Sequence, residues 1–166
     1  MKAVYAKFFV KYRGLPMNKA IHIHHSPVLD LYAACTDTVL ELPLAEQGVS
    51  AGFPSPAQDF MDTAIDLNRE LVRNPSSTFY ARVKGTSMQG AGIDHGDLLV
   101  IDKSVRVSDG RIAVCYLDGE FTVKRIRMDG EGCWLVPANE AYRPVRITAD
   151  NDFMVWGVVV YLIKPV

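Results

Sequence analysis

The chain has 166 residues and 49% of them are apolar, which predicts one domain with a substantial core plus additional segments. Its formal net charge of −1 excludes the overall basic field that recruits nucleic acid. No run of about 18 apolar residues occurs, so no transmembrane helix is expected. The three cysteines, Cys35, Cys115 and Cys133, form no CxxC pair, which indicates reduced cytoplasmic thiols rather than a disulfide framework or a zinc site.

The N-terminal 50 residues show no sustained helical or strand period and are expected to form an extended arm. Within them only "TVLELPL" (38–44) alternates well enough to predict a short strand. The arm ends at "VSAGFPSP" (49–56), where Pro54 and Pro56 exclude regular structure. Just before these prolines, Ala51 and Gly52 form a small, flexible pair.

An apolar stripe in residues 57–75 predicts a helix that ends at the Asn74-Pro75 pair. The stripe consists of Phe60, Ala64, Leu67, Leu71 and Val72. Asp66 is a candidate cap for a second, shorter helix, "LNRELV" (67–72).

From residue 78 onward the chain is predicted to be β. The expected strands are "TFYARVK" (78–84), "DLLVID" (97–102), a hairpin in 110–128, "CWLVPA" (133–138) and "FMVWGVVVYLIK" (153–164). The apolar run 97–102 is typical of a strand buried on both faces, and Asp118-Gly119 is a type I′ turn signal. The predicted fold is therefore mainly β: a partly closed antiparallel domain with a short helical segment and an extended N-terminal arm.

Histidine offers little basis for catalysis or metal binding in this sequence. His95 lies in the polar turn "GIDHGD", which is typical of a solvated residue rather than a triad base. The other histidines, His22, His24 and His25, lie in the arm, where His22 and His24 would share one face of a strand. No cysteine lies near them, and no metal is assigned to them.

Ser87 and Lys124 are the candidates for nucleophilic and acid–base chemistry. Ser87 follows a strand and enters a glycine-rich turn, "VKGTSMQGAG", although an ordinary turn serine would look the same. Lys124 shares its strand face with Ile126 and Met128. Desolvation on such a face lowers a lysine pKa, and a neutral amine is a general base for a hydroxyl. A surface lysine with its stem packed on apolar neighbours is the alternative.

Residues 48–166 resemble the peptidase-like domain of the LexA/UmuD family, self-cleaving proteins of the bacterial DNA-damage response. The resemblance rests on the stretch from "AGFPSPAQDF" to "VKGTSM" and then, in order, on "GIDHGDLLVIDKS", "DGEFTVKRI", "PANEAYRPVRI" and "VWGVVVYLIK". The spacings also agree, with 35 residues from Gly52 to Ser87 and 37 from Ser87 to Lys124.

The resemblance implies a serine–lysine dyad, with Ser87 as nucleophile and Lys124 as general base. It places the cut at Ala51–Gly52 of the protein's own chain and the oxyanion hole at the backbone N–H groups of Ser87 and Thr86. No cofactor or metal is implied. Residues 1–51 would be an arm removed by self-cleavage, and residues 52–166 the peptidase domain.

The family also implies partners. These are a second copy of the chain, the RecA–single-stranded DNA filament that stimulates cleavage, and a UmuC-like Y-family polymerase that joins the processed form in DNA polymerase V. Such a protein works in the cytoplasm during SOS mutagenesis, without a membrane and without sequence-specific DNA binding.

Three alternatives remain at this point. A LexA-like repressor or corepressor needs a DNA-binding domain, but the arm lacks two amphipathic helices and a basic recognition helix. Signal peptidase I also uses a serine and a lysine for catalysis, but it needs a membrane anchor, and the sequence shows none. A pure interaction module would need no intact cut site, serine and lysine, yet all three are present.

Overall fold

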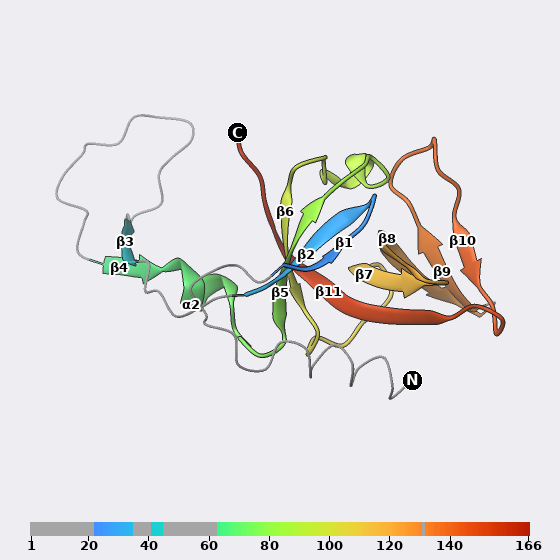
Figure 1. The fold of residues 1–166 in the computed structure, drawn as a ribbon, viewed down its shortest axis with the longest axis horizontal. Helices are drawn as coiled ribbons and strands as arrows, with labels where there is room; N and C mark the ends of the chain where they lie inside the picture. Colours follow the sequence, from blue (N-terminus) through green and yellow to red (C-terminus); the bar gives the residue numbers. More distant parts are fainter. Residues whose placement is uncertain (1–21, 35–40, 45–62, 131) are drawn as a thin grey trace.

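The computed structural model describes residues 22–34, 41–44, 63–130 and 132–166. Nine antiparallel strands form one sheet in the order β1-β2-β5-β6-β11-β7-β8-β9-β10 (Figure 1). Their bounds are β1 His22–His25, β2 Leu29–Ala33, β5 Thr78–Val83, β6 Leu98–Asp102, β7 Ile112–Leu117, β8 Glu120–Asp129, β9 Gly132–Val136, β10 Val145–Ile147 and β11 Phe153–Ile163. A second sheet pairs β3 (Glu41–Leu44) with β4 (Thr63–Asp66). The prediction of a mainly β, antiparallel domain is confirmed.

Strand β11 is the long bent strand of Figure 1, and it joins the two halves of the sheet. It pairs with β6 on one side and with β7 on the other, and its register shifts between Val159 and Tyr161 in the β6 ladder and between Val155 and Gly157 in the β7 ladder. A Cβ at Gly157 would lie 2.6 Å from the side chain of Ile101, so only glycine allows β11 to approach β6 this closely.

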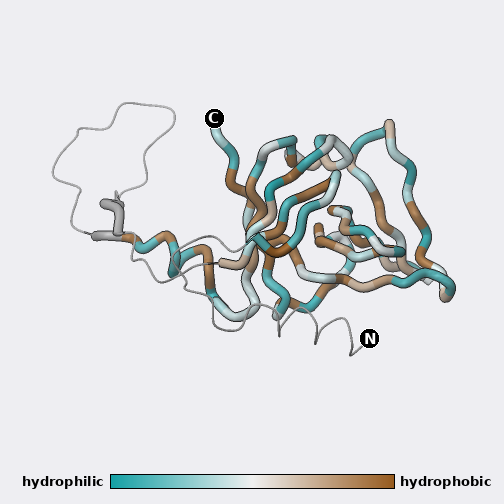
Figure 2. The backbone as a smooth tube through the Cα atoms, viewed as in Figure 1, coloured by the Kyte–Doolittle hydropathy of each residue, from teal (hydrophilic) through white to brown (hydrophobic). Residues whose placement is uncertain are grey.

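The core follows from strand alternation, and hydrophobic and hydrophilic residues alternate along much of the sheet in Figure 2. The larger buried cluster draws on β2, β5, β6, β7, β8 and β11, and a smaller one lies around β7, β8 and β9. Strand β6 is buried on both faces from Leu99 to Asp102, as its apolar run predicted. No helix in the described segments has the length and apolar character to cross a bilayer.

The turn and cap signals were correct. Asp118 and Gly119 both have positive φ, 48° and 100°, as a type I′ turn between β7 and β8 requires. Asp66 caps the short helix α2 (Leu67–Leu71) by accepting a hydrogen bond from Asn68 N at 3.0 Å. Strand β3 lies within the predicted strand 38–44, of which residues 38–40 lie outside the described part.

The helix predicted for 57–75 was correct over 67–71 and wrong over 63–66. Residues 63–66 form β4, which pairs with β3, and only five residues after them are helical. Residues 57–62 lie outside the described residues. A helical apolar stripe is a weak local preference, and cross-strand pairing overrides it here.

The N-terminal hairpin β1–β2 was not predicted. Its polar strand β1, "HIHH", carries one aliphatic residue, and β2 has only two strongly apolar positions, Leu29 and Leu31. Ser26 closes the turn, because its Oγ accepts hydrogen bonds from the N–H groups of Val28 and Leu29 at 3.3 and 3.1 Å. The hairpin is a strand pair because β5 offers an edge to β2, which no local pattern reveals.

Candidate active site

Ser87 lies in the turn that leaves β5. Gly85 has a φ of +90°, a conformation that strains other residues, and it redirects the chain just beyond the end of the strand. The 3₁₀-helix η1 (Gln89–Ala91) follows immediately. Strand, glycine turn and short helix therefore hold Ser87 at a fixed corner of the domain.

Lys124 reaches this corner from β8. Its Nζ lies 2.9 Å from Ser87 Oγ, although the two residues are 37 positions apart in sequence. Nζ also donates to Thr122 Oγ1 at 2.8 Å and to the carbonyl oxygen of Val123 at 3.0 Å. The structure thus brings the two predicted residues into direct contact and aims the amine at the hydroxyl.

Burial sets the protonation chemistry of Lys124. Desolvation lowers the pKa of this half-buried amine below its ordinary value, and a thiolate at Cys115 would oppose that effect. Burial, however, raises the pKa of the Cys115 thiol to about 12, so at neutral pH the thiol carries no charge. Desolvation therefore prevails at Lys124, and the neutral amine needed for proton abstraction becomes more accessible.

Thr122 is a site residue that the sequence analysis missed. It lies two positions before Lys124 on the same strand face, a relation that the strand period alone reveals. Its hydroxyl accepts a hydrogen bond from the lysine amine and so restricts where that amine can point. We therefore treat Thr122 as a positioning residue for Lys124.

Thr122→Val is expected to lower the maximal rate of any Ser87-dependent reaction about tenfold, because the amine loses one of its fixed contacts. The midpoint of the pH–rate profile should also move to lower pH, because an acceptor that favours the ammonium form is lost. Thr122→Ser, which keeps the hydroxyl, should retain the wild-type profile. If Thr122→Val lowers the rate but leaves the midpoint of the pH–rate profile unchanged, Thr122 has only a structural role.

The turn that carries Ser87 is also held by a loop that comes later in the sequence. The β9–β10 loop, residues 137–144, donates from Ala138 N to Ser87 O at 2.9 Å and accepts from Gly90 N at Ala138 O at 2.6 Å. Asn139 Nδ2 donates to Thr86 O at 2.9 Å, and Tyr142 OH lies 3.0 Å from Thr86 Oγ1. Sequence reasoning gave this loop no role, because most of these bonds use backbone atoms.

The sequence profile of the Peptidase S24-like family matches residues 43–160. The chain belongs to the Peptidase S24-like family. MucA of Salmonella typhimurium is 41% identical over 124 residues, which cover 74% of this chain and 84% of that protein. ImpA of Shigella flexneri is 37% identical over 127 residues, covering 73% and 82%. The LexA repressor of Acidithiobacillus ferrooxidans is 36% identical over 126 residues, covering 74% and 60%.

This membership confirms the LexA/UmuD resemblance, and it supports serine peptidase chemistry in general. The predicted cut site Ala51–Gly52 falls within the matched stretch but outside the described residues. Strands β3 and β4 bracket the segment 45–62 that contains it. His95 is exposed, and its Nδ1 accepts a hydrogen bond from Gly85 N at 3.4 Å, in agreement with a turn residue.

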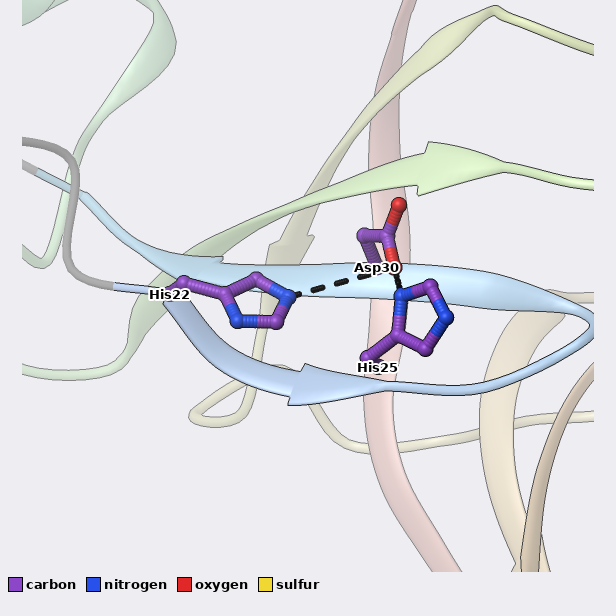
Figure 3. Close-up of side chains that lie close together, drawn as sticks. All are labelled: His22, His25 and Asp30. Atoms are coloured by element: carbon purple, nitrogen blue, oxygen red, sulfur yellow. Dashed lines mark hydrogen bonds and ion pairs between the residues drawn. The ribbon is translucent and has the colours of Figure 1, made fainter.

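The arm histidines lie ahead of the stretch that matches the Peptidase S24-like profile. His22 and His25 on β1 surround Asp30 on β2, and their ligand atoms lie within 4.8 Å of one another (Figure 3). The Lys84 ammonium also lies in this cluster, 2.8 Å from Asp30 Oδ1 and 3.1 Å from His25 Nδ1. A cation is therefore already in place, and we interpret the group as an ion-pair cluster rather than a metal site.

Proposed function

We propose that this protein hydrolyses its own Ala51–Gly52 bond, with Ser87 as nucleophile and Lys124 as general base. The observation that carries the proposal is the 2.9 Å contact between Lys124 Nζ and Ser87 Oγ in a partly desolvated setting. Family membership independently favours a peptidase. The substrate is part of the same chain, so its effective concentration is high and a deep binding pocket is unnecessary.

In the proposed first step, neutral Lys124 takes the proton of Ser87 Oγ as the oxygen attacks the carbonyl carbon of Ala51. The tetrahedral intermediate collapses, the C–N bond to Gly52 breaks, and Lys124 returns the proton to the leaving amine of Gly52. An ester between Ser87 and Ala51 remains. Lys124 then deprotonates a water molecule that hydrolyses this ester and frees Ser87.

The oxyanion is proposed to accept hydrogen bonds from the backbone N–H groups of Ser87 and Thr86. The carbonyl of Thr86 points to Asn139. In a trans peptide the next N–H points in the opposite direction, so the Ser87 N–H faces away from the 137–144 loop. This orientation supports the proposal that the Ser87 N–H donates to the oxyanion and not to the loop.

The proposed setting is SOS mutagenesis in the cytoplasm, as the UmuD-like motifs imply. The RecA–single-stranded DNA filament would speed cleavage by favouring the conformation in which the cut segment enters the site. The processed protein, as a homodimer, would then serve a UmuC-like Y-family polymerase as its accessory subunit. Similarity to MucA and ImpA supports this assignment.

A LexA-like repressor is the alternative, favoured by the similarity to a LexA repressor. In the described part of the N-terminal arm, however, residues 22–33 form a β-hairpin that pairs with the main sheet. A winged helix-turn-helix needs a helix free to enter the major groove. This observation favours the mutagenesis assignment over repression.

Incubation with activated RecA filament, or alone at alkaline pH, is expected to yield fragments 1–51 and 52–166 by mass spectrometry. Ser87→Ala should abolish both fragments. Gly52→Glu should also block the reaction, because a large charged side chain does not fit a closely packed scissile position. Cleavage at another bond, or cleavage that survives Ser87→Ala, would refute the assignment.

A further inference from the structure

We propose that fragment 1–51 stays bound to the peptidase domain after cleavage, as a hairpin seated on the edge of β5. The inference rests on the proposed cut site, because that site places the hairpin β1–β2 in the fragment removed. The surface concerned is the edge of β5 together with the apolar core beneath it. Its partner is the N-terminal segment of this same protein.

Backbone pairing is the first contact that retains the fragment. Strand β2 runs antiparallel to β5 over five residue pairs, from Leu29 opposite Val83 to Ala33 opposite Phe79. One further bond extends the ladder, from Lys84 N to the carbonyl oxygen of Val28 at 2.7 Å. The other edge of β5 is already paired with β6, so loss of β2 would leave β5 as an open edge strand (Figure 1).

Apolar packing is the second contact. Leu29 and Leu31 are fully buried, with 0% exposure, and belong to the same core cluster as Ala81 and Phe121 of the peptidase domain. The ring of His24 meets Phe121 edge-on, with centroids 4.9 Å apart. Departure of the fragment would expose two core leucines to water and open a void in the main cluster.

A polar cluster at the hairpin turn forms the third contact (Figure 3). Lys84, which belongs to the retained domain, donates to Asp30 Oδ1 at 2.8 Å and to Ser26 O at 3.3 Å. The hydrogen bond from Lys84 is the main cause that holds the pKa of Asp30 below its ordinary value, so the carboxylate is charged at neutral pH. The side chain of Asp30 is only 14% exposed, which shields the pair from solvent.

Hydrolysis between residues 51 and 52 breaks none of these contacts, since each joins 22–33 to residues beyond 77. Cleavage therefore converts an intramolecular strand pairing into a noncovalent complex. The product that reaches a partner is then the peptidase domain with β1 and β2 still in its sheet, and the edge of β5 stays closed to other chains.

The test uses the full chain with Ser87→Ala and a sequence-specific protease site inserted between Gly48 and Val49. Digestion cuts the connection without any self-cleavage. The two fragments are expected to co-elute in native size-exclusion chromatography and to separate in denaturant. Amide exchange at Tyr80, Arg82 and Lys84 should remain slow after digestion, because the alternate N–H groups of β5 that face β2 are the ones that the fragment protects.

Leu31→Ala in the same background is expected to weaken retention about 100-fold, since a fully buried leucine is truncated. Leu162→Ala is the matched control, because that leucine of β11 is 38% exposed. If Leu31→Ala does not fold, the exchange measurement on the parent variant still decides. Separate elution of the fragments together with rapid exchange at Tyr80, Arg82 and Lys84 would overturn the proposal.

The experiments distinguish a failure of the retention proposal from a failure of the self-cleavage proposal. If the wild-type protein does not cut itself while the digested Ser87→Ala chain holds together, only the proposed peptidase function is lost. If the wild type cuts at Ala51–Gly52 and the digested chain separates, only retention is lost.

Discussion

Lys124→Met is expected to reduce self-cleavage about 1,000-fold, toward the level of Ser87→Ala. Methionine is one atom shorter than lysine and has no nitrogen to accept the Ser87 proton, and removal of a general base costs about 10²- to 10⁴-fold. The folded state should not suffer, because a half-buried amine is replaced by an apolar side chain of similar volume. Cleavage followed by gel densitometry and a thermal melt would measure both effects.

The wild-type rate should also rise with pH. Lys124 acts only as the neutral amine, so the rate increases as pH rises through the pKa of Lys124 and levels off above it. Since desolvation lowers that pKa, the rise should occur below the titration range of an exposed lysine. Lys124→Met should show a low rate without this rise.

Lys103→Met provides a matched control. Lys103 is another partly buried lysine whose pKa is lowered by desolvation, and its ammonium lies 4.4 Å from the ring centroid of Trp156. This variant should cleave at the wild-type rate. Equal loss in both variants, or robust cleavage by Lys124→Met, would contradict the role given to Lys124.

Gly90→Ala is expected to slow self-cleavage about 100-fold although residue 90 takes no part in the chemistry. A Cβ at this position would lie 2.5 Å from the carbonyl oxygen of Ala138, so the 137–144 loop must withdraw by about 1 Å. The same loop donates from Ala138 N to Ser87 O. Its withdrawal releases the nucleophile turn, and a displacement of this size costs about 10²-fold in rate.

Gly130→Ala is the matched control for this effect, because a Cβ there would meet nothing within 4 Å and the residue has no left-handed φ. It should leave both the rate and the melting temperature unchanged. A normal rate in Gly90→Ala would show that the loop does not position Ser87.

The pairing of Ser87 with Lys124, the proposed catalytic residues, was predicted through resemblance and not through the residue patterns alone. Ser87 alone looks like a turn serine, and Lys124 alone looks like a lysine on a strand face. Their contact depends on β11, which aligns the two halves of the sheet between them. The two-residue strand period could have predicted that Thr122 lies beside Lys124. The hydrogen bonds of Ala138 use only backbone atoms, so the sequence could not predict them.

For the fold, strands that carry their own alternation or a turn signal were predicted, as at Asp118-Gly119. The hairpin 22–33 was missed because its strand character comes from the edge of β5, more than 40 residues away. The helix predicted across 63–66 failed for the same reason, since β3 captures that segment. Local patterns predict strands and turns whose own residues favour that structure. They miss strands that form only by pairing with a segment that is distant in the sequence.

The central position of β11 has a consequence for synthesis of the protein. Ser87 follows β5 and Lys124 lies on β8, on opposite sides of β11, which is synthesised after every other strand that the structure describes. A chain grows from its N-terminus, so the two halves cannot be joined correctly until residues 153–163 have emerged. A chain that has not been synthesised through β11 therefore lacks the strand that aligns Ser87 with Lys124, and the proposed self-cleavage has to wait until that strand has emerged.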